Sequence, residues 1–151
     1  MKITKIAFAS IALACFSSLS ASAKNDAKTA YIFGFASSFN DSTVYFTDVQ
    51  KVDSAYFTRK SKFLISRENY SYQLRDYLEQ QGAGKRTCIV MFDFDQKKAE
   101  KKWNKLYARY IQKPKAKKAK NGQQTNDAPS PYQVKTINPT DFHFSSVQPN
   151  D

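Results

Sequence analysis

The stretch "RTCIVMFDFDQKKAEKKWNKLYARYIQK", residues 86–113, changes its hydrophobic pattern near its middle. Residues 86–94 are apolar for nearly their whole length, which predicts a central strand with both faces covered. From residue 95, apolar residues recur at helical spacing and predict an amphipathic helix with a basic outer side. The apolar stripe is Ala99, Trp103, Leu106, Tyr107 and Tyr110. The outer side carries Lys98, Lys101, Lys102, Lys105 and Arg109.

The flanking segments complete an α+β pattern. Two β-favouring runs around the turn residues 40–42 predict a β-hairpin, and a helical period follows between an N-cap Ser66 and the stop residue Gly82. Residues 132–137 and 141–147 predict short strands. The natural arrangement is a two-layer sandwich, with a sheet of four to five strands and both helices on one face.

The N-terminal sequence predicts that the protein is exported. Lys2 and Lys5 precede a short apolar run, and a small-x-small site ends at Ala23, so residues 1–23 are typical of a secretory signal peptide. The alternative is a lipoprotein acylated at Cys15. Cleavage after Ala23 leaves residues 24–151 as a single domain, exported to the periplasm or the cell surface.

The positive charge is concentrated in one block. The formal net charge is +11, of which Lys2 and Lys5 supply two, so the mature chain keeps +9. Residues 97–120 hold 11 Lys or Arg and one Glu, a local charge of +10. Residues 113–131 lack large apolar side chains, which predicts a flexible Lys-rich loop inside the domain. The candidate anion-binding residues are Lys98, Lys101, Lys102, Lys105, Arg109, Lys113, Lys115, Lys117, Lys118 and Lys120.

Three interpretations of this basic block stay open. It forms a solvated surface that keeps an exported protein from aggregating. It binds an anionic envelope polymer (peptidoglycan, lipopolysaccharide or an acidic glycan) or a membrane surface. It contacts nucleic acid backbones, which export disfavours. We expect a non-catalytic binding or accessory module.

Catalytic signals are sparse, and no cofactor is expected. Asp93 and Asp95 either hold a metal ion together or cap the second helix, since residues two apart in a strand point the same way. An enzyme would need them beside groups such as Arg67, Glu68 or His143. The pair Gly84-Lys85 is not a phosphate loop, because no glycine stands at position 79 and a strand follows the lysine. We expect Cys88 to act as a small buried apolar residue.

Two resemblances add to this interpretation. The segments "YIFGFASSFNDSTVYFTDVQKVDSA" and "RENYSYQL" resemble a family of short exported proteins of Gram-negative anaerobic bacteria, which implies a location and no mechanism. The segments "KRTCIVMFDFDQKKAEKKWNKLY" and "YQVKTI" are similar to the second half of the SPOR module, a periplasmic peptidoglycan-binding fold, although that module has two strands between its helices. "DST" and "DSA" look like O-glycosylation sequons of such bacteria, at Ser42 and Ser54.

Overall fold

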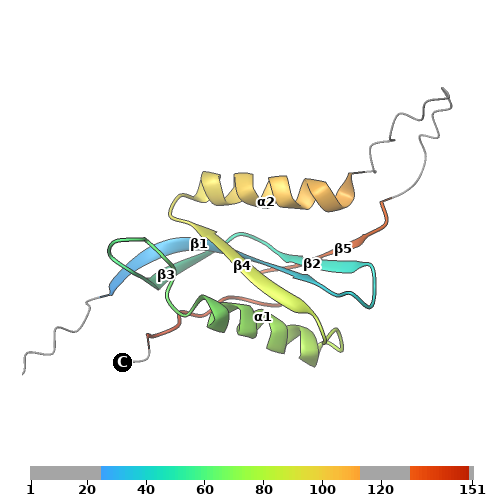
Figure 1. The fold of residues 1–151 in the computed structure, drawn as a ribbon, viewed down its shortest axis with the longest axis horizontal. Helices are drawn as coiled ribbons and strands as arrows, with labels where there is room; N and C mark the ends of the chain where they lie inside the picture. Colours follow the sequence, from blue (N-terminus) through green and yellow to red (C-terminus); the bar gives the residue numbers. More distant parts are fainter. Residues whose placement is uncertain (1–24, 113–129, 150–151) are drawn as a thin grey trace, which may run out of the picture.

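The computed structural model describes residues 25–112 and 130–149. Most of the predicted Lys-rich loop, with Lys113, Lys115, Lys117, Lys118 and Lys120, and the predicted signal peptide, with Cys15 and Ala23, lie outside them. The predicted α+β class is confirmed, with two helices and a five-stranded sheet (Figure 1). In chain order the elements are β1 (Asp26–Ser37), β2 (Thr43–Thr47), β3 (Gln50–Phe57), α1 (Arg67–Gln80), β4 (Thr87–Asp93), α2 (Gln96–Ile111) and β5 (Gln133–Ile137).

The long strand β1 organises the sheet. Its first half pairs with β3 and its second half with β2, both antiparallel, while β4 pairs along its opposite edge. β5 then joins β2 in parallel. The prediction that residues 86–94 form a central strand is therefore wrong, because β4 lies at an edge. The prediction that both of its faces are covered is confirmed, because a helix packs against each of them.

The two helices lie on opposite faces of the sheet, so the predicted two-layer arrangement is wrong in this respect (Figure 1). On β1, Phe35 points toward α2 and packs on Tyr110, with ring centroids 5.0 Å apart. The neighbouring Ala36 points the other way, into the cluster that contains Leu74 of α1. Because β1 is apolar on both sides, both of its faces have to be covered.

The boundaries of α1 differ in how well they were predicted. Ser66 precedes the helix in a left-handed conformation (φ 54°), and its side chain makes no capping hydrogen bond, so the predicted N-cap bond is wrong. At the other end, Gly82 has φ 72°. Its N–H donates to the Glu79 carbonyl and the Ala83 N–H to the Leu78 carbonyl, at 3.0 and 2.8 Å. This bond pair is a Schellman motif, and it confirms Gly82 as the stop residue.

The C-terminal segment, residues 138–149, covers the rest of the α1 face without forming the predicted strand. Phe142 and Phe144 point into the core, and His143 is exposed. The segment's backbone is bonded to side chains: Gln50 accepts from Phe144 N–H and donates to the Phe142 carbonyl, at 2.8 and 2.9 Å. These side-chain amide bonds replace the backbone hydrogen bonds that a paired strand would make.

Candidate functional site

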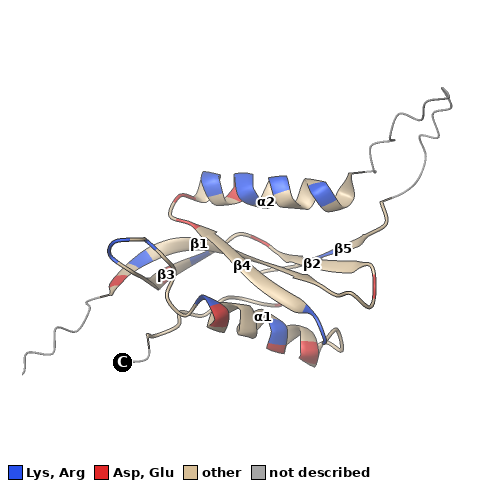
Figure 2. Cartoon of the chain, viewed as in Figure 1, with Lys and Arg blue, Asp and Glu red and all other residues tan. Residues whose placement is uncertain are grey.

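The outer side of α2 carries the predicted cations. Lys98, Lys101, Lys105 and Arg109, here called the basic face, are exposed along this helix (Figure 2). The apolar stripe fixes the helix rotation, because Trp103, Tyr107 and Tyr110 all pack on Phe46. Trp103 also donates from Nε1 to the Thr47 carbonyl at 2.8 Å. The predicted amphipathic helix is therefore confirmed.

Within the described residues, no carboxylate lies within ion-pair distance of the basic face. Among the described residues, Lys102 is the only α2 side chain in an ion pair within 4.0 Å. The four cations recur at three- or four-residue intervals, so they line one stripe roughly 16 Å long at 1.5 Å rise per residue. Such a stripe can contact several anionic groups of one extended ligand at once.

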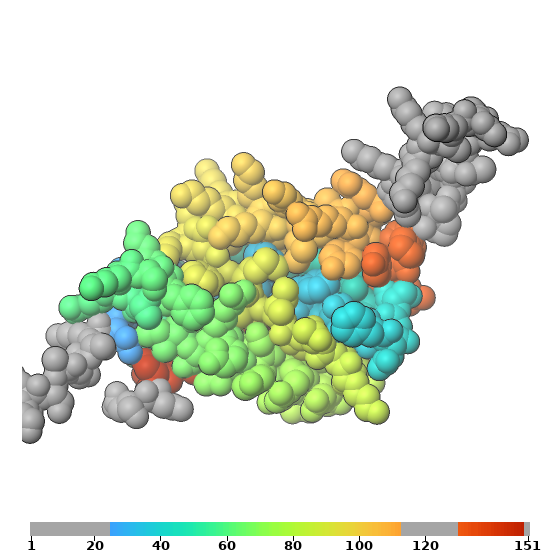
Figure 3. All heavy atoms as spheres, in the orientation of Figure 1, coloured from blue at the N-terminus to red at the C-terminus, as the bar shows by residue number. Residues whose placement is uncertain are grey.

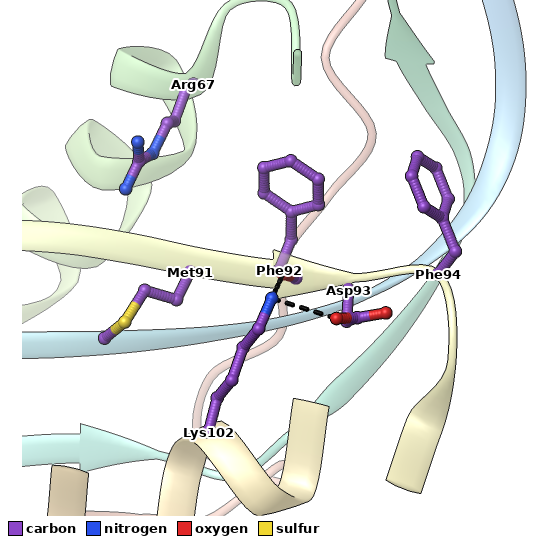
Figure 4. Close-up of a pocket in the computed structure, with 6 residues that line it drawn as sticks. All are labelled: Arg67, Met91, Phe92, Asp93, Phe94 and Lys102. Atoms are coloured by element: carbon purple, nitrogen blue, oxygen red, sulfur yellow. Dashed lines mark hydrogen bonds and ion pairs between the residues drawn. The ribbon is translucent and has the colours of Figure 1, made fainter. Parts of the chain in front are cut away.

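A cavity opens between α1 and α2, beside the end of β4. Its volume is about 390 Å³, and we call it the edge pocket. It combines two cationic side chains with an apolar wall that includes two phenylalanine rings (Figure 4). Its lining residues are Arg67, Met91, Phe92, Asp93, Phe94 and Lys102.

Both candidate metal ligands, Asp93 and Asp95, are engaged within the protein. Asp95 caps α2, because its Oδ1 accepts from the Lys98 N–H at 2.9 Å. Asp93 pairs with Lys102 (2.9 Å between Oδ2 and Nζ) and accepts from the Asp95 N–H at 3.1 Å. Burial acts to raise the pKa of Asp93, but the hydrogen bonds from Lys102 and Asp95 lower it by more, so this pKa lies below its ordinary value. The capping interpretation of Asp95 is confirmed.

Replacing Asp93 with asparagine is expected to lower the free energy of unfolding by about 1 kcal/mol near neutral pH. Because the pKa of Asp93 is lower in the folded than in the unfolded chain, the ionised form stabilises the fold above about pH 4, and this contribution fades as the pH falls further. Urea unfolding at several pH values should show the two proteins converging in acid. Asp76→Asn, which removes an exposed partner of Arg75, is the control. A gap that persists at low pH would contradict this role of Asp93.

The other candidate residues are dispersed. Arg67 shares the edge pocket with Asp93, whereas Glu68 and His143 do not line it. Within residues 25–112 and 130–149, no three His, Cys, Asp or Glu side chains gather as a metal site. Over the same residues, no helix is long and apolar enough to cross a bilayer.

The Cys88 thiol is not activated. Burial raises its pKa to about 11, which keeps it protonated at neutral pH.

Sequence reasoning missed the contacts made by two arginines. Arg67 donates from Nε and Nη2 to the Val90 carbonyl, at 3.0 and 2.6 Å. Arg86, whose side chain is 6% exposed, holds both carboxylate oxygens of Asp41 at 3.1 and 2.6 Å. In the sequence, Arg67 only follows the short segment FLIS, and Arg86 only precedes the apolar strand. Their partners are 23 and 45 positions away.

The candidate glycosylation sites are both exposed. Ser42 lies in the turn between β1 and β2, directly after Asp41, and Ser54 lies on β3. The backbone carbonyl of Ser54 accepts a hydrogen bond from the Ser146 hydroxyl. Glycosylation at Ser42 and Ser54 stays a prediction.

The chain matches no protein-family model, no curated protein and no solved structure. The resemblances to the exported family and to the SPOR module therefore stay predictions.

Proposed function

We propose that this protein is a non-catalytic binding or accessory module of the bacterial envelope, and that its basic face holds an anionic polymer. The supporting observation is the stripe of Lys98, Lys101, Lys105 and Arg109, exposed on a helix whose rotation is fixed by aromatic packing. Because the helix is already held in place, binding a repeating polyanion requires ordering of the cationic side chains but not of their backbone. Peptidoglycan, lipopolysaccharide and acidic glycans all provide such repeats.

The sequence beyond α2 supports the same assignment. The chain continues from this helix into residues 113–120, which add five lysines and no acid. The signal-peptide pattern at residues 1–23 favours export, where envelope polymers are the abundant polyanions and nucleic acid is scarce. We therefore place the module in the periplasm or at the cell surface. Anionic membrane headgroups are the alternative ligand, because they offer the same charge.

Four substitutions test the basic face. Changing Lys98, Lys101, Lys105 and Arg109 to Gln should weaken binding of the protein without residues 1–23 to lipopolysaccharide, or to isolated peptidoglycan, about tenfold or more. Binding can be measured by co-sedimentation or calorimetry, with anionic vesicles as a third ligand. The matched control changes Lys28, Lys51, Lys60 and Lys62 to Gln, which removes the same charge from β1, β3 and the loop after β3. Equal weakening by both sets would contradict the proposal.

A further inference from the structure

The outer edge of β4 turns backbone hydrogen-bonding groups away from β1, although Val90 itself is covered and 0% exposed. Val90 lies opposite Gly34 and Phe92 opposite Ile32 in the antiparallel pair with β1. The Gly34 N–H donates across to Thr47 Oγ1 at 2.8 Å, away from β4. Gly34 and Val90 therefore form a non-hydrogen-bonded pair, and Val90 and Phe92 turn their N–H and C=O groups outward. In the described part of the chain, no strand pairs with this edge.

Two cationic side chains from different helices donate hydrogen bonds to the outward-pointing carbonyls of β4. Arg67 of α1 bonds the Val90 carbonyl, and Lys102 of α2 bonds the Phe92 carbonyl at 2.9 Å. Lys102 also has Asp93 as an ionic partner, whereas Arg67 makes no ion pair with any described carboxylate. A half-buried guanidinium matched only by a carbonyl leaves a positive potential at the edge.

Arg67 covers Val90, but the residues on either side of it along the edge are accessible and partly apolar. In Figure 3 the atoms of β4 reach the surface between α1 and α2. Ile89 is 40% exposed and Phe94 is 38% exposed beside it. The edge pocket continues this surface to the end of the strand. A strand laid along β4 would cover both apolar side chains.

We propose that the outer edge of β4 docks an extended acidic segment of another protein, which adds to the sheet as a further strand. Its N–H groups take over the Val90 and Phe92 carbonyls, and its carboxylates receive the released Arg67 and Lys102. Arg67 reaches the edge from the α1 face of the sheet and Lys102 from the α2 face (Figure 4). Successive strand residues point to opposite faces, so two adjacent acidic residues fit both cations.

Charge excludes a second copy of this chain as the occupant. Antiparallel pairing of two β4 edges around Val90 would bring together two Arg67 side chains, neither of which forms an ion pair with a described carboxylate. Like charges at this spacing oppose association. A glycan is disfavoured too, since it offers no backbone ladder for Val90 and Phe92. This surface is separate from the basic face, so it can be tested independently of the proposed function.

The test is a nuclear magnetic resonance titration of the isotope-labelled protein with end-blocked peptides. The probe is TVTEEVTV, compared with TVTKKVTV and with TVTEPVTV, whose proline removes a backbone donor and one of the two carboxylates. We expect the Val90 and Phe92 amides to shift with the first peptide and far less with the other two. Arg67→Gln should weaken this binding about tenfold. The control Arg75→Gln, on the same helix but paired with Asp76, should not.

Three outcomes would overturn the proposal. The first is the absence of shifts at Val90 and Phe92 at millimolar peptide. The second is a set of shifts confined to the lysines of α2, which would indicate association with the basic face alone. The third is dimerisation of the free protein through β4, detected by sedimentation, which would identify a second copy as the occupant. Thermal unfolding of Arg67→Gln checks that its fold is intact.

Discussion

Replacing Gly34 with valine is expected to lower the free energy of unfolding by about 3 kcal/mol. A Cβ at this position would lie 2.6 Å from Leu74 Cδ2 and 3.1 Å from Phe144 Cζ. Leu74 is fully buried and Phe144 is 2% exposed, so neither can move aside without disturbing the packing of α1 and the C-terminal segment. The branched valine side chain makes the overlap larger than the Cβ alone.

Urea unfolding measures this effect, and Gly84 offers a matched control. A Cβ at Gly84 would meet Glu79 Cγ at 3.1 Å, but Glu79 is an exposed and flexible side chain that can give way. Gly84→Val should therefore change the free energy of unfolding by no more than about 0.5 kcal/mol. If Gly34→Val were equally mild, α1 would not rest directly on β1 at this point.

Replacing Gln50 with leucine is expected to lower the free energy of unfolding by about 3 kcal/mol. Gln50 is 3% exposed, and its amide satisfies the Phe142 carbonyl and the Phe144 N–H. Leucine keeps the apolar bulk but leaves both backbone groups without a partner in the core, at about 1–3 kcal/mol for each buried group. The C-terminal segment should also become easier to cleave with protease.

Gln73 provides the comparison for Gln50. It makes the same pair of amide bonds, to Ser145 O and Ser145 N at 3.0 and 2.9 Å, but at the exposed side of the segment. Water can replace these bonds, so Gln73→Leu should cost less than about 1 kcal/mol in urea unfolding. Equal effects of the two substitutions would show that burial does not set the strength of the Gln50 contacts.

Local signals predicted most of the secondary structure. The helical period of residues 96–111 and the cap Asp95 depend on neighbours a few positions apart, and so does the left-handed Gly82. The stripe predicted the apolar inner side of the second helix, which packs on the cluster that contains Phe46. These features need no knowledge of distant partners, because hydrophobic period and capping act within one element.

Long-range choices escaped prediction. The apolar strand at residues 87–93 correctly indicated that both of its faces are covered, but it could not indicate whether a neighbouring strand pairs with each of its two edges. The same limit explains the placement of α1 and α2 on opposite faces, which follows from the two-sided apolar pattern of β1. Gln50 looked like an ordinary polar residue and Arg67 like a possible active-site group, because their partners, Phe142 and Val90, are 92 and 23 positions away.

The most direct test of the proposed function is the salt dependence of binding to purified lipopolysaccharide. If the basic face contacts anionic groups, the affinity of the protein should fall steadily as the salt concentration is raised. Salt ions screen exposed charges, and the release of bound counterions on binding becomes less favourable at high salt. The variant with Lys98, Lys101, Lys105 and Arg109 changed to Gln should lose most of this slope, while the matched control keeps it. A slope near zero for the unmodified protein, or an unchanged slope for the variant, would contradict the assignment of the basic face as the binding surface.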